Sequence, residues 1–326
     1  TRILGANIFR LLKDRIFFHD PDDDASLVAV GRTSRGHLVR VNRRAVEADR
    51  LVLTGSATYH YHAGFGGGRK ALVPGLASRD TIAHNHGLTL DPVENRMRPG
   101  VDIGILDGNP VAEEMLESAR MCDPDIIINT VLTPDGGLAG VFSGDLDLAH
   151  RRACALVEKV SRVNISCLAD FAVASASTAG NWIQGHKALF NASRCVKPGG
   201  KIILVAPCPE GLGDESFRYW IKKRDIPAIC TELRKSPEIL GQTALSTITR
   251  GRNTILVTKM PQKDLADLGI ASAPDLSSAL ETVLREFAIS GNQIASRSSE
   301  CKGGTPSCWI MPKALHTVPF PPLAVH

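Results

Sequence analysis

Several features that mark other protein classes are missing from this 326-residue chain. It has no apolar run of roughly 18 residues and no basic start followed by an apolar stretch, so neither a membrane span nor a secretory signal is indicated. Aromatic residues make up 5% of the chain, and the basic residues form no tracts interleaved with them, so nucleic-acid binding is not expected. The eight cysteines contain no C-x-x-C pair. We therefore interpret them as reduced thiols in a cytoplasmic protein.

The composition is that of an ordinary globular protein. Hydrophobic residues make up 43% and charged residues 22%, with a net charge of +4. At roughly 150 residues per domain, the length predicts about two domains with separate hydrophobic cores. The chain starts with Thr1 rather than Met, and we interpret this start as processed or truncated.

Apolar segments of strand length alternate with segments of helical periodicity. This alternation predicts an α/β fold with largely parallel sheets, and nearly continuous Val, Ile and Leu are typical of strands covered on both faces. The expected strands are 27–31, 50–54, 101–106, 125–131, 169–174, 201–206, 254–258 and 309–311. The expected helices are one that begins near Ser78 or Asp80, and 110–121, 145–163, 181–194, 216–224 and 276–287.

These elements divide into two α/β domains, and we expect the active site in the cleft between them. The expected divisions are an N-terminal domain over 1–146, a connecting helix over 147–166, a Rossmann-like C-terminal domain over 167–296, and a tail over 297–326. We expect the tail either to return to the first domain or to be poorly ordered at its end.

The segment 59–70, YHYHAGFGGGRK, is the most informative part of the sequence. It follows a predicted strand, and α/β sheets bind ligands at the carboxyl ends of their strands. Its glycines would let the backbone approach an anion. The segment is neither a Walker A loop, because Arg69 and Ala71 flank Lys70, nor a G-x-G-x-x-G motif. A flexible turn with incidental charge is the alternative interpretation.

Four of the ten histidines lie between positions 60 and 86: His60, His62, His84 and His86. A single histidine is usually structural, but such a cluster next to a glycine-rich loop favours metal binding or proton transfer. Gln184 and Lys187 are three residues apart on a predicted helix and so share one face. They could bind a carboxylate, or they could form an ordinary exposed polar face.

Taken together, these motifs resemble the nickel-dependent lactate racemase family. The resemblance rests first on HxxAGFxGGRK at 60–70, LVPG at 72–75, TI at 81–82, NH at 85–86 and GNPV at 108–111. It continues with QxxKAL at 184–189, VKPGG at 196–200 and CPEGLG at 208–213, and extends from about residue 27 to 259.

The resemblance implies racemisation or epimerisation of a short 2-hydroxy acid, such as lactate or a related sugar acid, by proton-coupled hydride transfer. The implied cofactors are nickel and the nickel pincer nucleotide, a pyridinium-3-thioamide-5-thiocarboxylic acid mononucleotide, and its biosynthetic enzymes are implied partners. By position, Lys70 resembles the lysine that tethers this nucleotide and His86 the protein ligand of nickel. His60 resembles one of two proton-transferring histidines, and Gln184 and Lys187 resemble residues that meet the substrate.

Other expectations depend on that resemblance. We hypothesise that Gly66, Gly67, Gly68 and Arg69 face the nucleotide phosphate. Family members begin with a further segment that contains the second histidine, so we expect this chain to be truncated, with apolar surface exposed in its first domain and oligomerisation or poor solubility as the result. Two alternatives stay open: a non-catalytic relative that binds the cofactor or an organic acid, and a metal-dependent hydrolase that uses His60, His62, His84 and His86.

Overall fold

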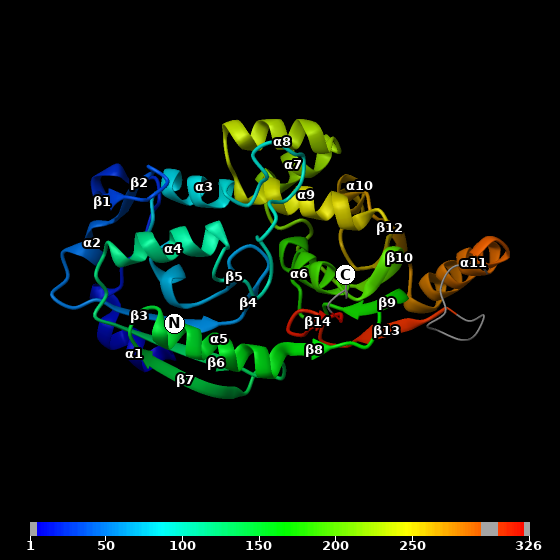
Figure 1. Ribbon diagram of the computed structural model, residues 1–326, viewed down its shortest axis with the longest axis horizontal. Helices are drawn as coiled ribbons and strands as arrows, with labels where there is room; N and C mark the ends of the chain where they lie inside the picture. The colour runs from blue at the N-terminus through cyan, green and yellow to red at the C-terminus, as the bar shows by residue number, and fades with distance from the viewer. Residues whose placement is uncertain (1–4, 295–305, 323–326) are drawn as a thin grey trace.

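The computed structural model describes residues 5–294 and 306–322. They form an N-terminal unit around a three-stranded sheet and a C-terminal unit around a five-stranded parallel sheet (Figure 1). This mixed α/β architecture agrees with the predicted fold class. Among the described residues, no helix combines the length and the apolar character needed to cross a membrane.

The elements alternate along the chain. The α-helices are α1 Gly5–Leu12, α2 Arg43–Val46, α3 Arg79–Gly87, α4 Pro110–Arg120, α5 Leu148–Ser161, α6 Trp182–Ala192, α7 Glu215–Lys223, α8 Ile226–Lys235, α9 Ile239–Gly251, α10 Gln262–Leu268 and α11 Leu276–Ile294. The strands are β1 Leu27–Arg32, β2 Leu38–Asn42, β3 Val52–Ala57, β4 Tyr59–His60, β5 Gly64–Phe65, β6 Ile126–Leu132, β7 Leu138–Gly144, β8 Arg162–Asn164, β9 Ala169–Ser175, β10 Val196–Val205, β11 Thr254–Val257, β12 Ala271–Ala273, β13 Cys308–Met311 and β14 Val318–Phe320. Short 3₁₀ helices are η1 Lys13–Arg15, η2 Asp24–Ser26 and η3 Gly68–Ala71.

The C-terminal sheet has the strand order β12-β11-β10-β9-β13. Side chains alternate between its two faces because successive residues of a strand point in opposite directions. Phe171 and Ile203 pack with Val283 of α11 on one face, whereas Leu204 and Leu256 belong to the larger core on the other. Helices therefore cover both faces, which explains the nearly continuous apolar strands.

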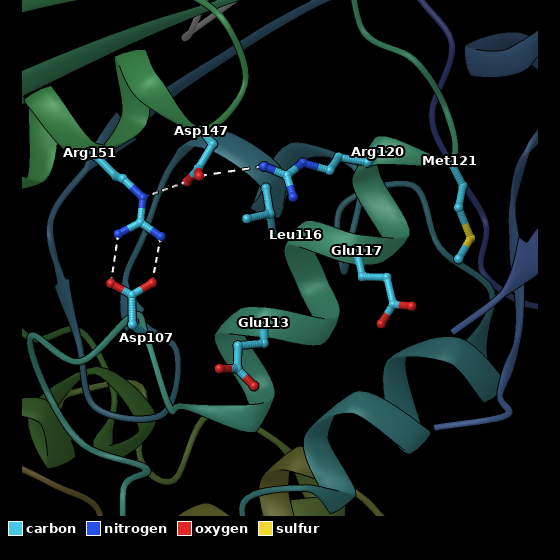
Figure 2. A pocket seen from close by; sticks show the side chains of 8 residues that line it. All are labelled: Asp107, Glu113, Leu116, Glu117, Arg120, Met121, Asp147 and Arg151. Carbon is cyan, nitrogen blue, oxygen red and sulfur yellow. Dashed lines mark hydrogen bonds and ion pairs between the residues drawn. The ribbon is translucent and has the colours of Figure 1, made fainter. Parts of the chain in front are cut away.

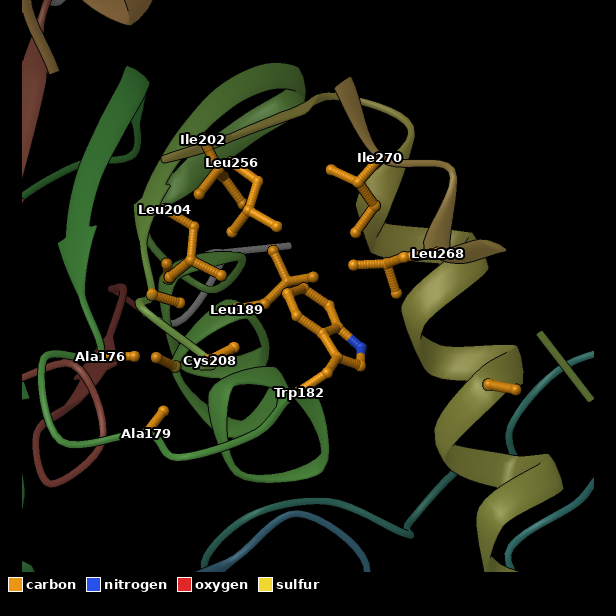
Figure 3. Packing of buried hydrophobic residues seen from close by; sticks show 14 of the residues in the cluster. Ala176, Ala179, Trp182, Leu189, Ile202, Leu204, Cys208, Leu256, Leu268 and Ile270 are labelled. Atoms are coloured by element: carbon orange, nitrogen blue, oxygen red, sulfur yellow. The ribbon is translucent and has the colours of Figure 1, made fainter. Parts of the chain in front are cut away.

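Trp182 at the start of α6 lies in this larger core. It is fully buried among Leu189, Leu204 and Leu268 (Figure 3). Its indole Nε1–H donates to Thr247 Oγ1 of α9 at 3.2 Å, so the one polar atom of the ring is paired. The core thereby fixes the helix that presents Gln184 and Lys187.

The N-terminal sheet is covered by helices on one face. β3 and β6 are parallel and β7 is antiparallel to β6, while Val157 of α5 packs in a cluster with Ala57 and Val131. The exposed apolar side chains of these strands include Val52, Ile128, Leu138 and Val141. Exposed apolar surface in this part of the chain agrees with the prediction.

The segment 306–322 brings strands back to both parts of the molecule. β13 pairs with β9 at the edge of the C-terminal sheet. β14 then pairs in parallel with β8, the strand by which the chain crosses from α5 to the second unit. The predicted tail over 297–326 also includes 297–305 and 323–326, which lie outside the described residues.

The structure corrects several predicted elements. Residues 101–106 do not form a strand, because Gly104 has a left-handed φ of 78° and the Asp102 carboxylate accepts the Ile103 N–H. β3 spans Val52–Ala57 instead of 50–54. Strands β2 and β7 and helices α8, α9 and α10 were not predicted from the sequence.

The cysteines of the described residues are free thiols. Cys301 lies outside the described residues. The remaining positions are Cys122, Cys154, Cys167, Cys195, Cys208, Cys230 and Cys308.

Candidate active site

A cleft of about 700 Å³ lies between the two units. Tyr59, His60 and Tyr61 line it from the N-terminal unit, at the β4–β5 hairpin that follows β3. Gln184 and Lys187 line it from α6 of the C-terminal unit. Three residues predicted from the sequence, His60, Gln184 and Lys187, therefore lie in one cavity.

His60 is held by the backbone of its own hairpin. Its Nδ1 accepts hydrogen bonds from the N–H groups of His62 and Ala63, each at 3.2 Å. In the neutral ring the proton is therefore on Nε2. Burial, followed by the positive charge of Lys70, holds the pKa of His60 well below its usual value.

Lys70 lies in η3, the turn that follows the glycine-rich segment. Burial, with the charges of Arg69 and then Lys187, lowers the pKa of Lys70 to about 7. The positive charge of Lys70 also lowers the pKa values of His60 and His86. These three side chains therefore share one electrostatic environment, which favours the neutral amine of Lys70 far more than water does.

His86 is fixed by its own helix α3. Its Nδ1–H donates to the carbonyl of Ile82 at 2.7 Å, and burial lowers the pKa of His86 to about 4. Among the described residues, Nε2 of His86 has no hydrogen-bond partner. A neutral imidazole with one N–H bonded to a carbonyl and a free lone pair on the other nitrogen has the arrangement of a metal ligand.

Gln184 and Lys187 share one face of α6, as their spacing predicts. Lys187 Nζ donates to Gln184 Oε1 at 3.0 Å. Asn181 caps the helix by accepting the N–H of Gln184. Burial lowers the pKa of Lys187, and the pair presents an ammonium and amide N–H donors to the cleft, which suits a carboxylate.

The four histidines do not converge on one point. His84 stacks on His37 with ring centroids 4.1 Å apart, and its Nε2 contacts the Glu114 carboxylate at 3.2 Å. His62 is buried with neither ring nitrogen hydrogen-bonded. In the part of the chain that the structure describes, no group of three or more His, Cys, Asp or Glu side chains could hold a metal, so the four-histidine hydrolase is not supported.

The position of Arg69 differs from the prediction that its guanidinium faces a phosphate. Its side chain is 2% exposed, with Nη1 bonded to His150 Nδ1 at 2.9 Å and Nη2 donating to the Ala63 carbonyl at 3.3 Å. It lies between η3 and α5, because the 3₁₀ turn directs consecutive side chains to different sides. The cleft residues do not include it.

The glycines of the segment also serve packing. The N–H of Gly66 donates to the Thr58 carbonyl at 2.7 Å and that of Gly68 to Asn129 Oδ1 at 2.7 Å, so neither is free for an anion. A Cβ on Gly67 would lie 2.3 Å from Asn129 Oδ1. We therefore correct the predicted phosphate cradle for Gly66 and Gly68 and attribute these glycines to close contact with β3, β6 and α5.

Two site residues were not predicted from the sequence. Tyr61 stacks on His60, with ring centroids 5.1 Å apart and planes 7° from parallel. Gln242 of α9 is fully buried and donates its amide Nε2–H to the carbonyl of His86. Tyr61 lies within the segment 59–70 but was not assigned a role there, and its ring also packs against Phe190 of α6, with ring centroids 5.4 Å apart. No motif marks Gln242, because it is defined by a contact between the two units.

A second hollow of about 570 Å³ lies beside α4 and α5 (Figure 2). Its charged groups are largely paired with one another: Arg151 binds Asp107 through two hydrogen bonds and also Asp147. None of the residues predicted for the site lines it. The cleft between the units is therefore the candidate active site.

Comparisons with known proteins find similar lactate racemases. Residues 1–97 match the family model of the lactate racemase N-terminal domain. The lactate racemase of Lactiplantibacillus plantarum is 33% identical over 283 residues and that of Thermoanaerobacterium thermosaccharolyticum 29% over 279, each alignment covering 82% of this chain. The chain spans 64% of the length of each of these relatives.

Solved structures support the fold. The lactate racemase apoprotein from Thermoanaerobacterium thermosaccharolyticum is similar, with a TM-score of 0.78 and 25% identity over 93% of this chain and 70% of that one. A protein from Thermotoga maritima has a TM-score of 0.59 and 17% identity over 90% of this chain and 77% of that one.

Proposed function

Because this chain belongs to the lactate racemase family, we propose that it racemises or epimerises a short 2-hydroxy acid, with lactate as the first substrate to test. The observation that carries the proposal is the meeting of residues from both units. His60 and Lys187 line one cleft. The positive charge of Lys70 lowers the pKa of His60, and that of Lys187 lowers the pKa of Lys70.

We further propose that Lys70 and His86 hold the nickel pincer nucleotide. The fit rests on two features of these side chains: Lys70 is a partly buried amine whose pKa is lowered to about 7, and His86 keeps Nε2 without a hydrogen bond in the described structure. A neutral amine suits covalent attachment, and a free imidazole lone pair suits nickel. When bound, this group would supply the hydride acceptor and donor.

The remaining residues orient the substrate and handle its proton. Lys187 and the Gln184 amide would bind the carboxylate by charge and hydrogen bonding. His60 would exchange the hydroxyl proton at Nε2, within a low-dielectric cleft walled by Tyr61 and Phe190. In the tautomer set by the backbone, Nε2 bears the proton. The resting ring can therefore donate to a keto oxygen that becomes a hydroxyl, and it must first release this proton to accept one from a hydroxyl substrate.

The alternative is a relative that binds the cofactor or an organic acid without turnover. The chain spans 64% of the length of its curated relatives, so the activity of those proteins is for this chain a hypothesis. The two possibilities differ in one observable, which is turnover by protein that already carries the cofactor.

The test is co-production with the cofactor-biosynthesis enzymes, followed by intact mass, nickel content and chiral analysis of lactate. We expect a covalent adduct on the Lys70 peptide, nickel, and conversion of either enantiomer. Lys70→Ala should lose the adduct, whereas His60→Ala should keep it and lose turnover. Lys222→Ala removes a lysine that is 60% exposed and is the matched control.

Each outcome has one meaning. Adduct and nickel without racemisation would support the non-catalytic relative. An adduct that persists in Lys70→Ala would overturn the assignment of the tether. Zinc without nickel would favour a hydrolytic metal site instead.

A further inference from the structure

Tyr61 lies where the two units meet. It belongs to the turn between β4 and β5, but its ring packs against two side chains of α6. These are His186, with ring centroids 5.4 Å apart and planes at 70°, and Phe190, with centroids 5.4 Å apart and planes at 45°. Its hydroxyl lies 3.4 Å from Thr243 Oγ1 of α9. The C-terminal unit therefore holds this ring of the N-terminal unit along its side and at its tip.

The direction of the hydrogen bond from the Tyr61 hydroxyl can be assigned. Thr243 Oγ1 donates its own proton to the Ile239 carbonyl at 3.1 Å, so it accepts from the tyrosine. Burial raises the pKa of Tyr61, which keeps the hydroxyl protonated and able to donate. Because the hydroxyl is bonded to α9, Tyr61 contacts His60 through the face of its ring.

The imidazole of His60 is constrained in two ways. Its Nδ1 accepts from the N–H groups of His62 and Ala63, each at 3.2 Å, which fixes one edge of the ring. The Tyr61 ring lies parallel to it, with planes 7° apart and centroids 5.1 Å apart, in the offset stack that aromatic rings prefer. A ring bonded at one edge can still tilt about that edge, and a parallel neighbour opposes the tilt. The two constraints together set the direction of Nε2.

We propose that Tyr61 is a positioning residue, whose ring transmits the docking of α6 and α9 to the plane of the His60 imidazole. When the C-terminal unit is docked, its side chains hold the Tyr61 ring, and that ring holds His60. The support of His60 thus comes from both units, as does the lining of the cleft. The use of Nε2 in proton transfer rests on the proposed function, whereas the orientation of the ring does not.

The first experiment observes His60 in the unloaded chain by NMR of histidine-labelled protein, with His60→Gln to assign its signals. The stacked ring should shift the carbon-bound protons of His60 upfield. Tyr61→Phe keeps the ring and should leave the two nitrogen signals of His60 unchanged. Tyr61→Leu keeps an apolar side chain without a ring, and should move the two nitrogen signals toward each other, as in an imidazole that exchanges tautomers.

Two further variants separate transmission from local packing. Phe190→Leu removes a support of the Tyr61 ring on α6, and should move the His60 nitrogen signals in the same direction by a smaller amount. Tyr219→Leu is the matched control, because Tyr219 is 55% exposed and its hydroxyl donates to Glu232 at 2.7 Å. This control should change neither the His60 signals nor turnover. If Tyr61→Leu does not fold, Phe190→Leu and the upfield shift in the unsubstituted chain still decide the test.

In loaded protein the same variants should separate kcat from KM. Displacement of a catalytic atom by about 1 Å can cost roughly a hundredfold in rate, so Tyr61→Leu should lower kcat for lactate by about ten- to a hundredfold. Its KM should change by less than about threefold, because Gln184 and Lys187 still bind the carboxylate. Tyr61→Phe should keep kcat within about threefold of that of the unsubstituted protein.

Two results would overturn the proposal: His60 nitrogen signals that stay unchanged in Tyr61→Leu, or equal changes in Tyr61→Phe and Tyr61→Leu, which would assign the effect to the hydroxyl. Both are separate from failure of the proposed function, which is measured as turnover. His60 signals that respond to Tyr61→Leu in a protein that never racemises lactate would support this inference and refute the racemase proposal.

Discussion

Substitution of Gly67 by alanine tests whether the glycine-rich segment serves packing. Gly67 has a φ of +76°, and an added Cβ would meet Asn129 Oδ1 at 2.3 Å and backbone atoms of Ser56 and Ala57 at 3.1 Å. A left-handed conformation costs an alanine about 1–2 kcal/mol, and overpacking adds about 1–3 kcal/mol. We therefore expect Gly67→Ala to lower the free energy of unfolding by about 2–5 kcal/mol.

Gly136→Ala is the matched control for this substitution. Gly136 also has a positive φ, of +87°, but a Cβ there meets nothing within 4 Å. It should cost the conformational part alone, about 1–2 kcal/mol. Equilibrium urea unfolding measures the free energy of unfolding of both variants. The two values can be compared directly when the m-values are equal.

The packing explanation predicts that Gly67→Ala is the more destabilising of the two by about 1–3 kcal/mol. Equal costs would refute it. A stable Gly67→Ala protein that fails to bind the nucleotide would instead restore a direct role for this backbone at the cofactor.

Three further substitutions or measurements test other parts of the structure. The pKa of Lys70 is about 7 in the fold and about 10.4 in an unfolded chain, so the unfolded state binds more protons between these values and stability rises with pH across that window. Lys70→Met should remove this rise and be the more stable protein at pH 7, measured by urea unfolding at pH 7 and 9; a parallel pH dependence in both proteins would contradict this. Nitrogen-15 NMR of His60 should find the proton on Nε2, and a proton on Nδ1 would show that the two backbone hydrogen bonds are absent. Trp182→Ala should cost about 3–5 kcal/mol because the indole is fully buried, and a loss below about 1 kcal/mol in thermal or urea unfolding would disprove that packing.

The helical positions of the histidines were predictable from the sequence. Residues two apart on a helix point in nearly opposite directions, so His84 and His86 could not both face one ligand. The structure shows this separation, with His84 against His37 and Glu114 and His86 free at Nε2. The same geometry applied to Gln184 and Lys187 gives one shared face, which the structure has.

The direction of Arg69 could not be predicted in the same way. A glycine-rich turn has no fixed periodicity, so the sequence does not say whether a guanidinium faces a cleft or the interior. The interior partner is His150, which lies 81 positions away in α5. Its Nε2 is bonded in turn to the Gly66 carbonyl at 2.9 Å.

Residues 101–106 show how an apolar run can mislead. Ile103 is 4% exposed, as in a buried strand, but it packs with Phe190 and Val318 between the two units. An apolar run indicates that a segment is buried. A turn packed between two units is buried as fully as a strand is, so the run does not distinguish the two. Contacts of this kind, including Gln242 with His86, depend on how separate segments meet and leave no local pattern.

The pairing of β8 with β14 determines how the two units can move. The single crossing strand is hydrogen-bonded in parallel to the returning strand, so the connection behaves as a two-stranded ribbon, which bends across its face more readily than it stretches or shears. Parting of the two units at this connection would therefore bend the ribbon. Helix α8 lies away from this ribbon (Figure 1), and its Arg234 donates to the carbonyls of Asp91, Val93 and Glu94. Bending of the ribbon that parts the two units would also break these hydrogen bonds, so the connection and Arg234 together resist opening of the cleft.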